Sequence, residues 1–116
     1  MYKYDEVISV LTSNFSEMKE IFEKDEDYYE DLPYLFYESE FVPFIVECAN
    51  NGSEGILKKA FEIVEELMKN GDEKVVNLVE VAVVESIFLD TTISNKKIIE
   101  EYFGTLTKNS YQDCTK

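Results

Sequence analysis

Histidine and arginine are missing from this chain of 116 residues, and glycine occurs only four times. Histidine is the commonest general base and metal ligand, so its absence disfavours zinc sites and Ser-His-Asp catalysis. The sequence also contains no glycine-rich phosphate-binding loop. We therefore expect no catalytic residues, no cofactor and no metal, and we do not expect an enzyme.

Long apolar runs are missing too. No segment approaches the roughly 18 to 20 apolar residues of a membrane-spanning helix, and the opening residues MYKYDEV lack the apolar stretch of a signal peptide. The two cysteines, Cys48 and Cys114, are too few for a disulfide framework and fit a reducing compartment. We expect a cytoplasmic protein.

What is present favours helices. Between residues 53 and 90, apolar residues recur at three- and four-residue steps up to Met68, and the stretch from Val75 to Leu89 is almost wholly apolar. Gly71 stands where a left-handed residue would end the first helix, and Asp72 where an N-cap would open the second. A β-strand over residues 75–84 is the alternative, because β-branched residues abound there. Length and the cap favour a central buried helix over residues 73–89.

The remaining elements are expected to be short. Helices are predicted near residues 4–13, from Ser16 to about 24, and from about 95 to 103. Pro43 indicates a turn at 34–38 followed by a separate helix at 40–49. The fold class is thus all-α: a compact bundle of about six helices, with short α-solenoid-like stacking as a second arrangement. We expect a single helical domain over residues 1–104 and a polar, non-periodic C-terminal tail over residues 105–116.

Acidic residues dominate the charge. The net charge is −14, and no lysine occurs between Asp25 and Lys58. Such a charge disfavours binding to nucleic acid or an anionic membrane and favours a basic protein partner. A strongly acidic surface also serves solubility without any partner.

Carboxylates and tyrosines alternate in the segment between residues 25 and 40, which suits recognition of a basic protein. The predicted partner-binding residues are Asp25, Asp27, Tyr28, Tyr29, Glu30, Asp31, Tyr37, Glu38 and Glu40. The aromatic residues of this region have a second interpretation, as core. Core is favoured for Phe36 and Phe41, and both interpretations stay open for Tyr28 and Tyr29.

Two other acidic patterns are candidates for chemistry, one for a calcium loop and one for a catalytic pair of carboxylates. Asp25 and Asp27 alternate as in a calcium loop, but the central glycine of such a loop is absent. Glu80 and Glu85 interrupt the most apolar stretch, yet their five-residue spacing puts them about 500° apart around a helix. We interpret them as the polar edge of that helix.

The segment from Gly71 to Ile87, GDEKVVNLVEVAVVESI, resembles a motif of small acidic bacterial proteins found beside secreted polymorphic toxins. The residues that match are Gly71, Asp72, Glu73, Val75, Asn77, Leu78, Val79 and Glu85. Leu32-Pro33, followed by aromatic residues and an apolar helix, is similar as well, and the likeness covers most of residues 5–103. The resemblance implies a helical immunity protein or a related domain of unknown function, and it implies no catalytic residues.

We accordingly expect an immunity protein that binds and neutralises a cognate, basic toxin domain by protein–protein contact. A helical adaptor or regulatory module that binds a partner unrelated to toxins is the alternative.

Overall fold

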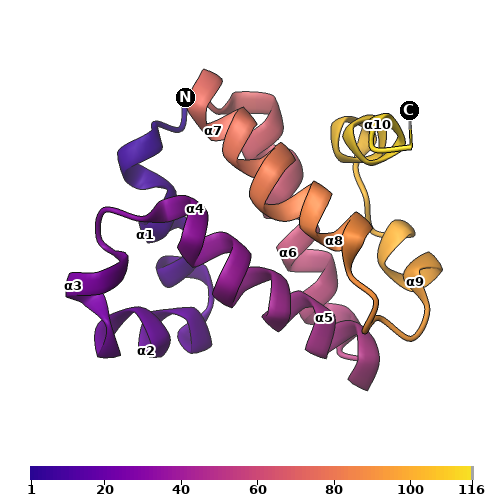
Figure 1. Cartoon of the computed structure of the whole chain (residues 1–116), viewed down its shortest axis with the longest axis horizontal. Coiled ribbons are helices and arrows are strands. Elements are labelled where there is room, and N and C mark those ends of the chain that lie inside the picture. The colour runs from indigo at the N-terminus through magenta and orange to yellow at the C-terminus, as the bar shows by residue number, and fades with distance from the viewer. Residues whose placement is uncertain (116) are drawn as a thin grey trace.

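Three long helical stretches form the centre of the computed structural model, which describes residues 1–115 (Figure 1). The first covers residues 33–51 and consists of α4 (Pro33–Phe36), η2 (Tyr37–Phe41) and α5 (Val42–Asn51). The second is α6 (Glu54–Asn70). The third covers residues 73–89 and consists of α7 (Glu73–Leu78), η3 (Val79–Glu85) and α8 (Ser86–Leu89).

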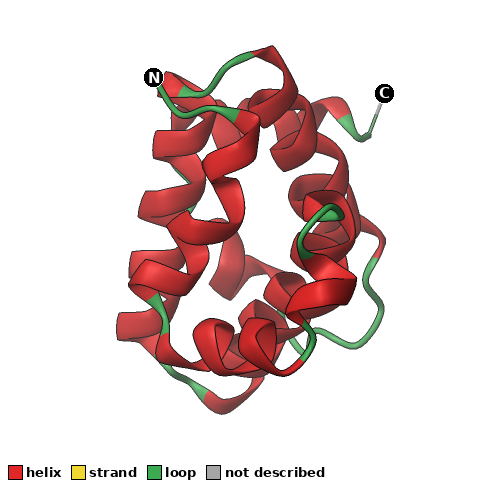
Figure 2. Cartoon of the chain, turned by 90° about the vertical axis from the view of Figure 1, so that its left-hand side faces the viewer, coloured by secondary structure: helices red, strands yellow, loops and turns green. Residues whose placement is uncertain are grey.

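Shorter helices cover the two sides of this centre. On one side lie η1 (Tyr4–Glu6), α1 (Val7–Asn14), α2 (Ser16–Lys24) and α3 (Glu26–Tyr29), and on the other lie α9 (Lys96–Glu100) and α10 (Thr105–Asp113) (Figure 1). Counting each continuous stretch once, residues 1–115 contain eight helices, two more than expected, joined by short loops (Figure 2). These residues contain no strand, only an isolated bridge between Tyr2 and Gly71. The all-α prediction is therefore confirmed.

The helix over residues 73–89 is the most deeply buried element, as its apolar sequence predicted. Its buried residues are Val75, Leu78, Val79, Ala82, Val83, Val84 and Ile87. It packs against η2, α5, α6 and α10, and an edge that includes Glu80, Val81 and Glu85 remains exposed to solvent. The strand alternative for residues 75–84 is wrong, because these residues form a continuous helix whose many neighbours bury most of its apolar side chains.

Pro43 does not separate a turn from a helix, as the sequence analysis expected. Residues 37–41 form a π-helical turn, in which the Val42 N–H donates to the Tyr37 carbonyl five residues earlier. The wider turn accommodates a residue that lacks an N–H and would crowd the carbonyl four residues before it. The helix therefore continues through residues 33–51.

The turn between α6 and α7 is held by Asp72 and not by a left-handed glycine. The Asp72 carboxylate accepts hydrogen bonds from the Val75 N–H at 2.9 Å and the Tyr4 N–H at 3.3 Å, so it caps α7 and also anchors the N-terminal segment. Gly71 has φ −84°, which any residue adopts, so the left-handed prediction is wrong. Glycine is needed there because a Cβ would collide with the Leu67 carbonyl and the Val75 side chain.

The expected non-periodic tail is instead the helix α10. It packs against α6 and η3, and its Thr107 and Ser110 are buried. The Glu65 carboxylate on α6 accepts hydrogen bonds from the N–H groups of Leu106 and Thr107, both at 2.9 Å, and from the Thr107 hydroxyl at 2.8 Å. A side chain 41 residues away thus caps this helix, and no local periodicity could reveal it.

Candidate functional site

The acidic segment predicted from the sequence forms one continuous exposed surface. It runs from the end of α2 through α3 into the turn before α4, and we call it the acidic face. Its members, all exposed, are Asp25, Glu26, Asp27, Tyr28, Glu30, Asp31 and Leu32. Lys24 lies beside this face, but among the described residues no lysine forms an ion pair with its carboxylates, so the face presents concentrated negative charge to solvent.

Local chain geometry explains why these side chains point outward. Asp25 has φ −132° and ψ 36°, which ends α2 and starts the single turn of α3. Leu32 is held out of helical geometry, as residues before proline usually are, and α4 begins at Pro33. Repulsion within a run of carboxylates predicts a frayed helix end or an exposed loop here, whereas the structure has the short helix α3 between two breaks.

Two apolar side chains stand among these carboxylates. Tyr28 is 58% exposed and Leu32 is 41% exposed. The Tyr28 ring packs edge-on against the Tyr29 ring, with centroids 5.0 Å apart, and Tyr29 in turn packs against Phe36. The exposed ring is therefore braced by the core, as an anchor residue at an interface should be.

Tyr29 and Tyr37, both predicted to bind the partner, belong to the core. Tyr29 is 6% exposed and Tyr37 is fully buried, and the Tyr37 hydroxyl donates to the Val7 carbonyl at 2.6 Å. Direct contact of these two rings with a partner is excluded in this fold. Core packing of Phe36 and Phe41 is confirmed, since both are fully buried.

The two remaining predicted residues, Glu38 and Glu40, differ from each other. Glu38 is exposed on η2, whereas Glu40 is partly buried and accepts a hydrogen bond from the Tyr29 hydroxyl. That hydrogen bond, burial and the nearby negative charges raise the pKa of Tyr29 to about 12. Glu40 therefore fixes Tyr29 beneath the acidic face and supports Tyr28 indirectly.

A hollow of about 450 Å³ adjoins the acidic face, between α1 and the turn before α4. The residues that line it are Tyr4, Asp5, Ile8, Ser9, Thr12, Phe22, Glu30, Asp31 and Pro33. Glu30 and Asp31 thus belong both to this hollow and to the acidic face. Asp5 and Leu32 were not among the residues predicted from the sequence, because their proximity to the other acidic residues depends on how the helices pack.

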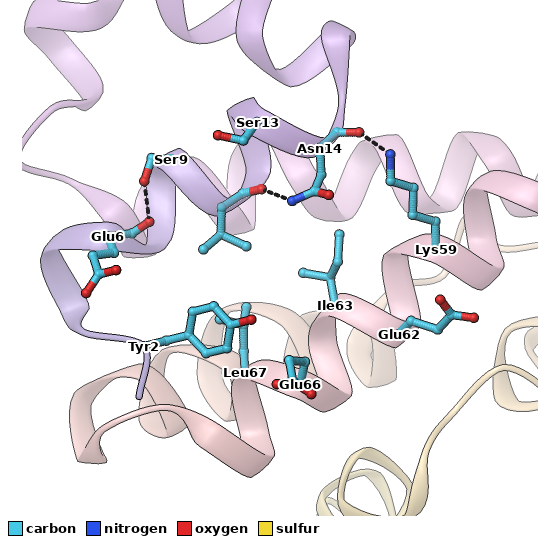
Figure 3. Close-up of a pocket in the computed structure, with 11 residues that line it drawn as sticks. Tyr2, Glu6, Ser9, Ser13, Asn14, Lys59, Glu62, Ile63, Glu66 and Leu67 are labelled. Carbon is cyan, nitrogen blue, oxygen red and sulfur yellow. Dashed lines mark hydrogen bonds between the residues drawn. The ribbon is translucent and has the colours of Figure 1, made fainter.

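A second, larger depression of about 620 Å³ lies between α1 and α6, and we call it the groove (Figure 3). Several of its polar groups are already engaged within the chain. The Lys59 ammonium donates to the Asn14 carbonyl at 2.5 Å, and the Asn14 amide donates to the Val10 carbonyl at 2.7 Å (Figure 3). The groove therefore contains a fixed positive charge, which the hollow does not.

The carboxylates that were candidates for catalysis or for calcium binding are exposed. Glu80 and Glu85 both face solvent along the central helix, as the interpretation of a polar edge predicted. Among residues 1–115, no group of three or more Cys, Asp and Glu side chains is arranged to hold a metal ion.

Within the described part of the chain, no helix has both the length and the apolar character needed to cross a bilayer.

These features define a class: a small, strongly acidic, all-α protein with a charged surface and an adjoining hollow. The chain belongs to the family described as a domain of unknown function (DUF7674), which it matches over residues 8–116. No curated protein and no solved structure matches it.

Proposed function

We propose that the protein is an immunity protein, which binds and neutralises a cognate toxin domain through its acidic face. The observation that carries the proposal is the combination of dense, unpaired carboxylates with Tyr28 and Leu32, two exposed apolar side chains. Interfaces commonly combine an aromatic anchor with a charged rim. The resemblance to proteins found beside polymorphic toxins supports the same role.

Electrostatics supply the mechanism. Toxin domains that act on nucleic acid have basic clefts, and an acidic surface can occupy such a cleft in place of phosphate. With a net charge of −14, the protein should attract a basic partner over long range and speed the encounter. The Tyr28 ring would then be buried on contact and slow dissociation.

Co-expression tests the biological role. A toxin domain encoded beside this protein's gene should stop growth when expressed alone, and growth should return when this protein is co-expressed. A protein that captures the toxin domain without restoring growth would not be an immunity protein. No capture at all, together with capture of another basic protein, would favour the alternative of a helical adaptor.

Binding kinetics test the site. The triple variant Asp27→Asn, Glu30→Gln, Asp31→Asn should lower the association rate about tenfold at low salt, because steering depends on these charges. Tyr28→Ala should mainly raise the dissociation rate. Stopped-flow or surface plasmon resonance at low and high salt separates the two effects.

A matched triple variant provides the control. Glu62→Gln, Glu66→Gln and Glu101→Gln remove the same number of charges from exposed positions outside the acidic face. At physiological salt this control should alter the association rate much less than the acidic-face variant, because the Debye length there is about 8 Å and only charges near the interface steer strongly. Equal effects of both triple variants would place the interface elsewhere on the domain.

A further inference from the structure

We infer that the hollow beside the acidic face receives one arginine side chain of a basic protein partner. The inference rests on the proposed binding role of the acidic face, because Glu30 and Asp31 belong to both. It adds the chemistry of the group that docks and the position at which it docks.

The walls of the hollow suit the apolar stem of a long side chain. Ile8 and Phe22 are partly exposed there, and Pro33 forms part of the same wall. Basic side chains commonly lay their methylene groups along such apolar surface while the charged head reaches polar groups. Phe22 also offers an aromatic ring against which a guanidinium can stack.

The rim of the hollow carries three carboxylates from two separate segments. Asp5 comes from η1, and Glu30 and Asp31 come from the turn before α4. No lysine lines the hollow, and within residues 1–115 no lysine forms an ion pair with any of these three. The Lys74 ammonium lies 5.0 Å from the centroid of the Tyr4 ring at the hollow, but it forms no ion pair with these carboxylates. The three carboxylates can therefore still pair with a cation from outside.

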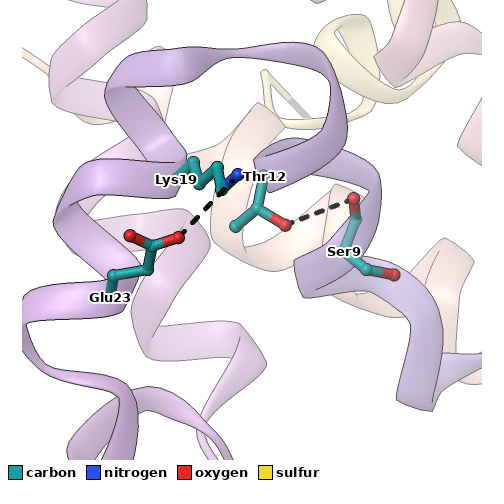
Figure 4. Close-up of polar contacts among 4 residues, drawn as sticks. All are labelled: Ser9, Thr12, Lys19 and Glu23. Carbon is teal, nitrogen blue, oxygen red and sulfur yellow. Dashed lines mark hydrogen bonds and ion pairs between the residues drawn. The ribbon is translucent and has the colours of Figure 1, made fainter.

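The hydroxyl groups in the hollow also favour a ligand that only donates. The Ser9 hydroxyl donates to the Glu6 carbonyl at 2.8 Å (Figure 3). The Thr12 hydroxyl donates to the Ser9 carbonyl at 3.4 Å (Figure 4). Each hydroxyl has one hydrogen and two lone pairs, so lone pairs are what remain for a ligand. Apart from the Tyr4 hydroxyl, the polar side chains that line the hollow thus present acceptors.

Arginine fits this arrangement better than lysine. A guanidinium has five N–H donors and no acceptor, and its planar shape can bridge two carboxylates while stacking on a ring. The groove between α1 and α6 fits it less well, although it too has three glutamates. Lys59 lies within the groove and would repel a second cation.

A capped amino acid is the direct probe. Nα-acetyl-arginine methylamide, titrated into the full chain labelled with ¹⁵N, should shift the amide signals of Asp5, Ile8, Thr12 and Asp31 in a saturable manner. The citrulline analogue has nearly the same shape without the charge and should cause no saturable shift. The lysine analogue should bind more weakly than the arginine probe.

Variants then assign the binding to the hollow. Asp5→Asn and Glu30→Gln should each weaken arginine binding about threefold, the usual scale for a solvent-exposed ion pair. Glu62→Gln in the groove is the matched control and should leave the arginine affinity unchanged. Since all three side chains are exposed, unchanged thermal melts should confirm that each variant folds.

Several results would overturn the inference: equal binding of the citrulline analogue, lysine binding as tight as arginine, or equal effects of Glu62→Gln and Glu30→Gln. The titration with the arginine probe requires no toxin. Arginine binding in a protein that fails to restore growth would contradict the proposed function alone, and rescue without arginine binding would contradict the hollow alone.

Discussion

Single side chains tie together parts of the chain that are far apart in sequence. Glu65 is the clearest case, because its carboxylate caps α10 from the side of α6. Burial is the largest influence on the pKa of Glu65 and raises it, but the hydrogen bonds from Leu106 and Thr107, together with Lys69, outweigh burial and hold the pKa below its usual value. A Cβ at Gly104 would collide with the Glu65 side chain, so glycine there lets Glu65 keep its capping position.

Glu65→Gln should lower the free energy of unfolding at neutral pH by about 1 kcal/mol, the usual effect of weakening a helix cap. A folded-state pKa below the unfolded value contributes stability above the unfolded pKa, and that stability disappears as pH falls through the folded pKa. The difference between the parent and Glu65→Gln should therefore shrink in acid. Urea denaturation at neutral and acid pH measures it.

The exposed neighbour Glu66 provides the control for this experiment. Glu66→Gln should change the free energy of unfolding by less than about 0.5 kcal/mol. A gap between the parent and Glu65→Gln that is equally large in acid would show that the carboxylate charge is not what stabilises α10.

At the scale of elements, two π-helical turns meet in the core. η2 accommodates Pro43 in the helix over residues 33–51, and it packs against η3 in the central helix. Within η3, Val79 is fully buried whereas Val81 is 44% exposed. Neighbouring valines of one apolar run thus have opposite environments, which makes a sharp comparison possible.

Val79→Asp should lower the free energy of unfolding by about 3–5 kcal/mol, because it buries a carboxylate without a partner. That is much of the total stability of a small domain, commonly about 5–15 kcal/mol. Val81→Asp introduces the same group into the same turn, where solvent reaches it, and should cost less than about 1 kcal/mol. Equal melting temperatures of the two variants would contradict the packing of the central helix.

For the whole molecule, repulsion between carboxylates is the dominant electrostatic effect. The protein contains 25 acidic residues against 11 lysines, and within residues 1–112 the one ion pair is Lys19–Glu23 at 3.9 Å (Figure 4). Both side chains of that pair are more than 60% exposed, so it contributes little. Added salt screens both attraction and repulsion between charges. Because this protein has few ion pairs and many like charges, salt should reduce repulsion more than attraction.

The melting temperature should therefore rise by about 5 °C, the shift that roughly 1 kcal/mol produces in a domain of this size, when NaCl is increased from about 10 to about 200 mM. Differential scanning calorimetry measures the change. The triple variant Asp27→Asn, Glu30→Gln, Asp31→Asn should start from a higher melting temperature and respond less to salt. A melting temperature that falls with salt would mean that attractive pairs outweigh the repulsion.

Much of the fold follows from local patterns. The periodicity of residues 53–89 determines two helices, and the Asp72 cap between them depends only on its neighbours in the chain. The acidic face was predictable for the same reason, because a run of carboxylates has too little apolar surface to be buried. The sequence alone therefore determined the helical class, the central helix and the location of the charge.

Tertiary packing decided the rest. Tyr28 and Tyr29 are adjacent and chemically identical, yet only one faces solvent, because Phe36 and Glu40 lie on the other side. The hollow requires Asp5 to meet Glu30, and the cap of α10 requires Glu65 to meet Leu106. Each depends on residues distant in sequence, whose separation is set by how whole helices pack and not by any local pattern.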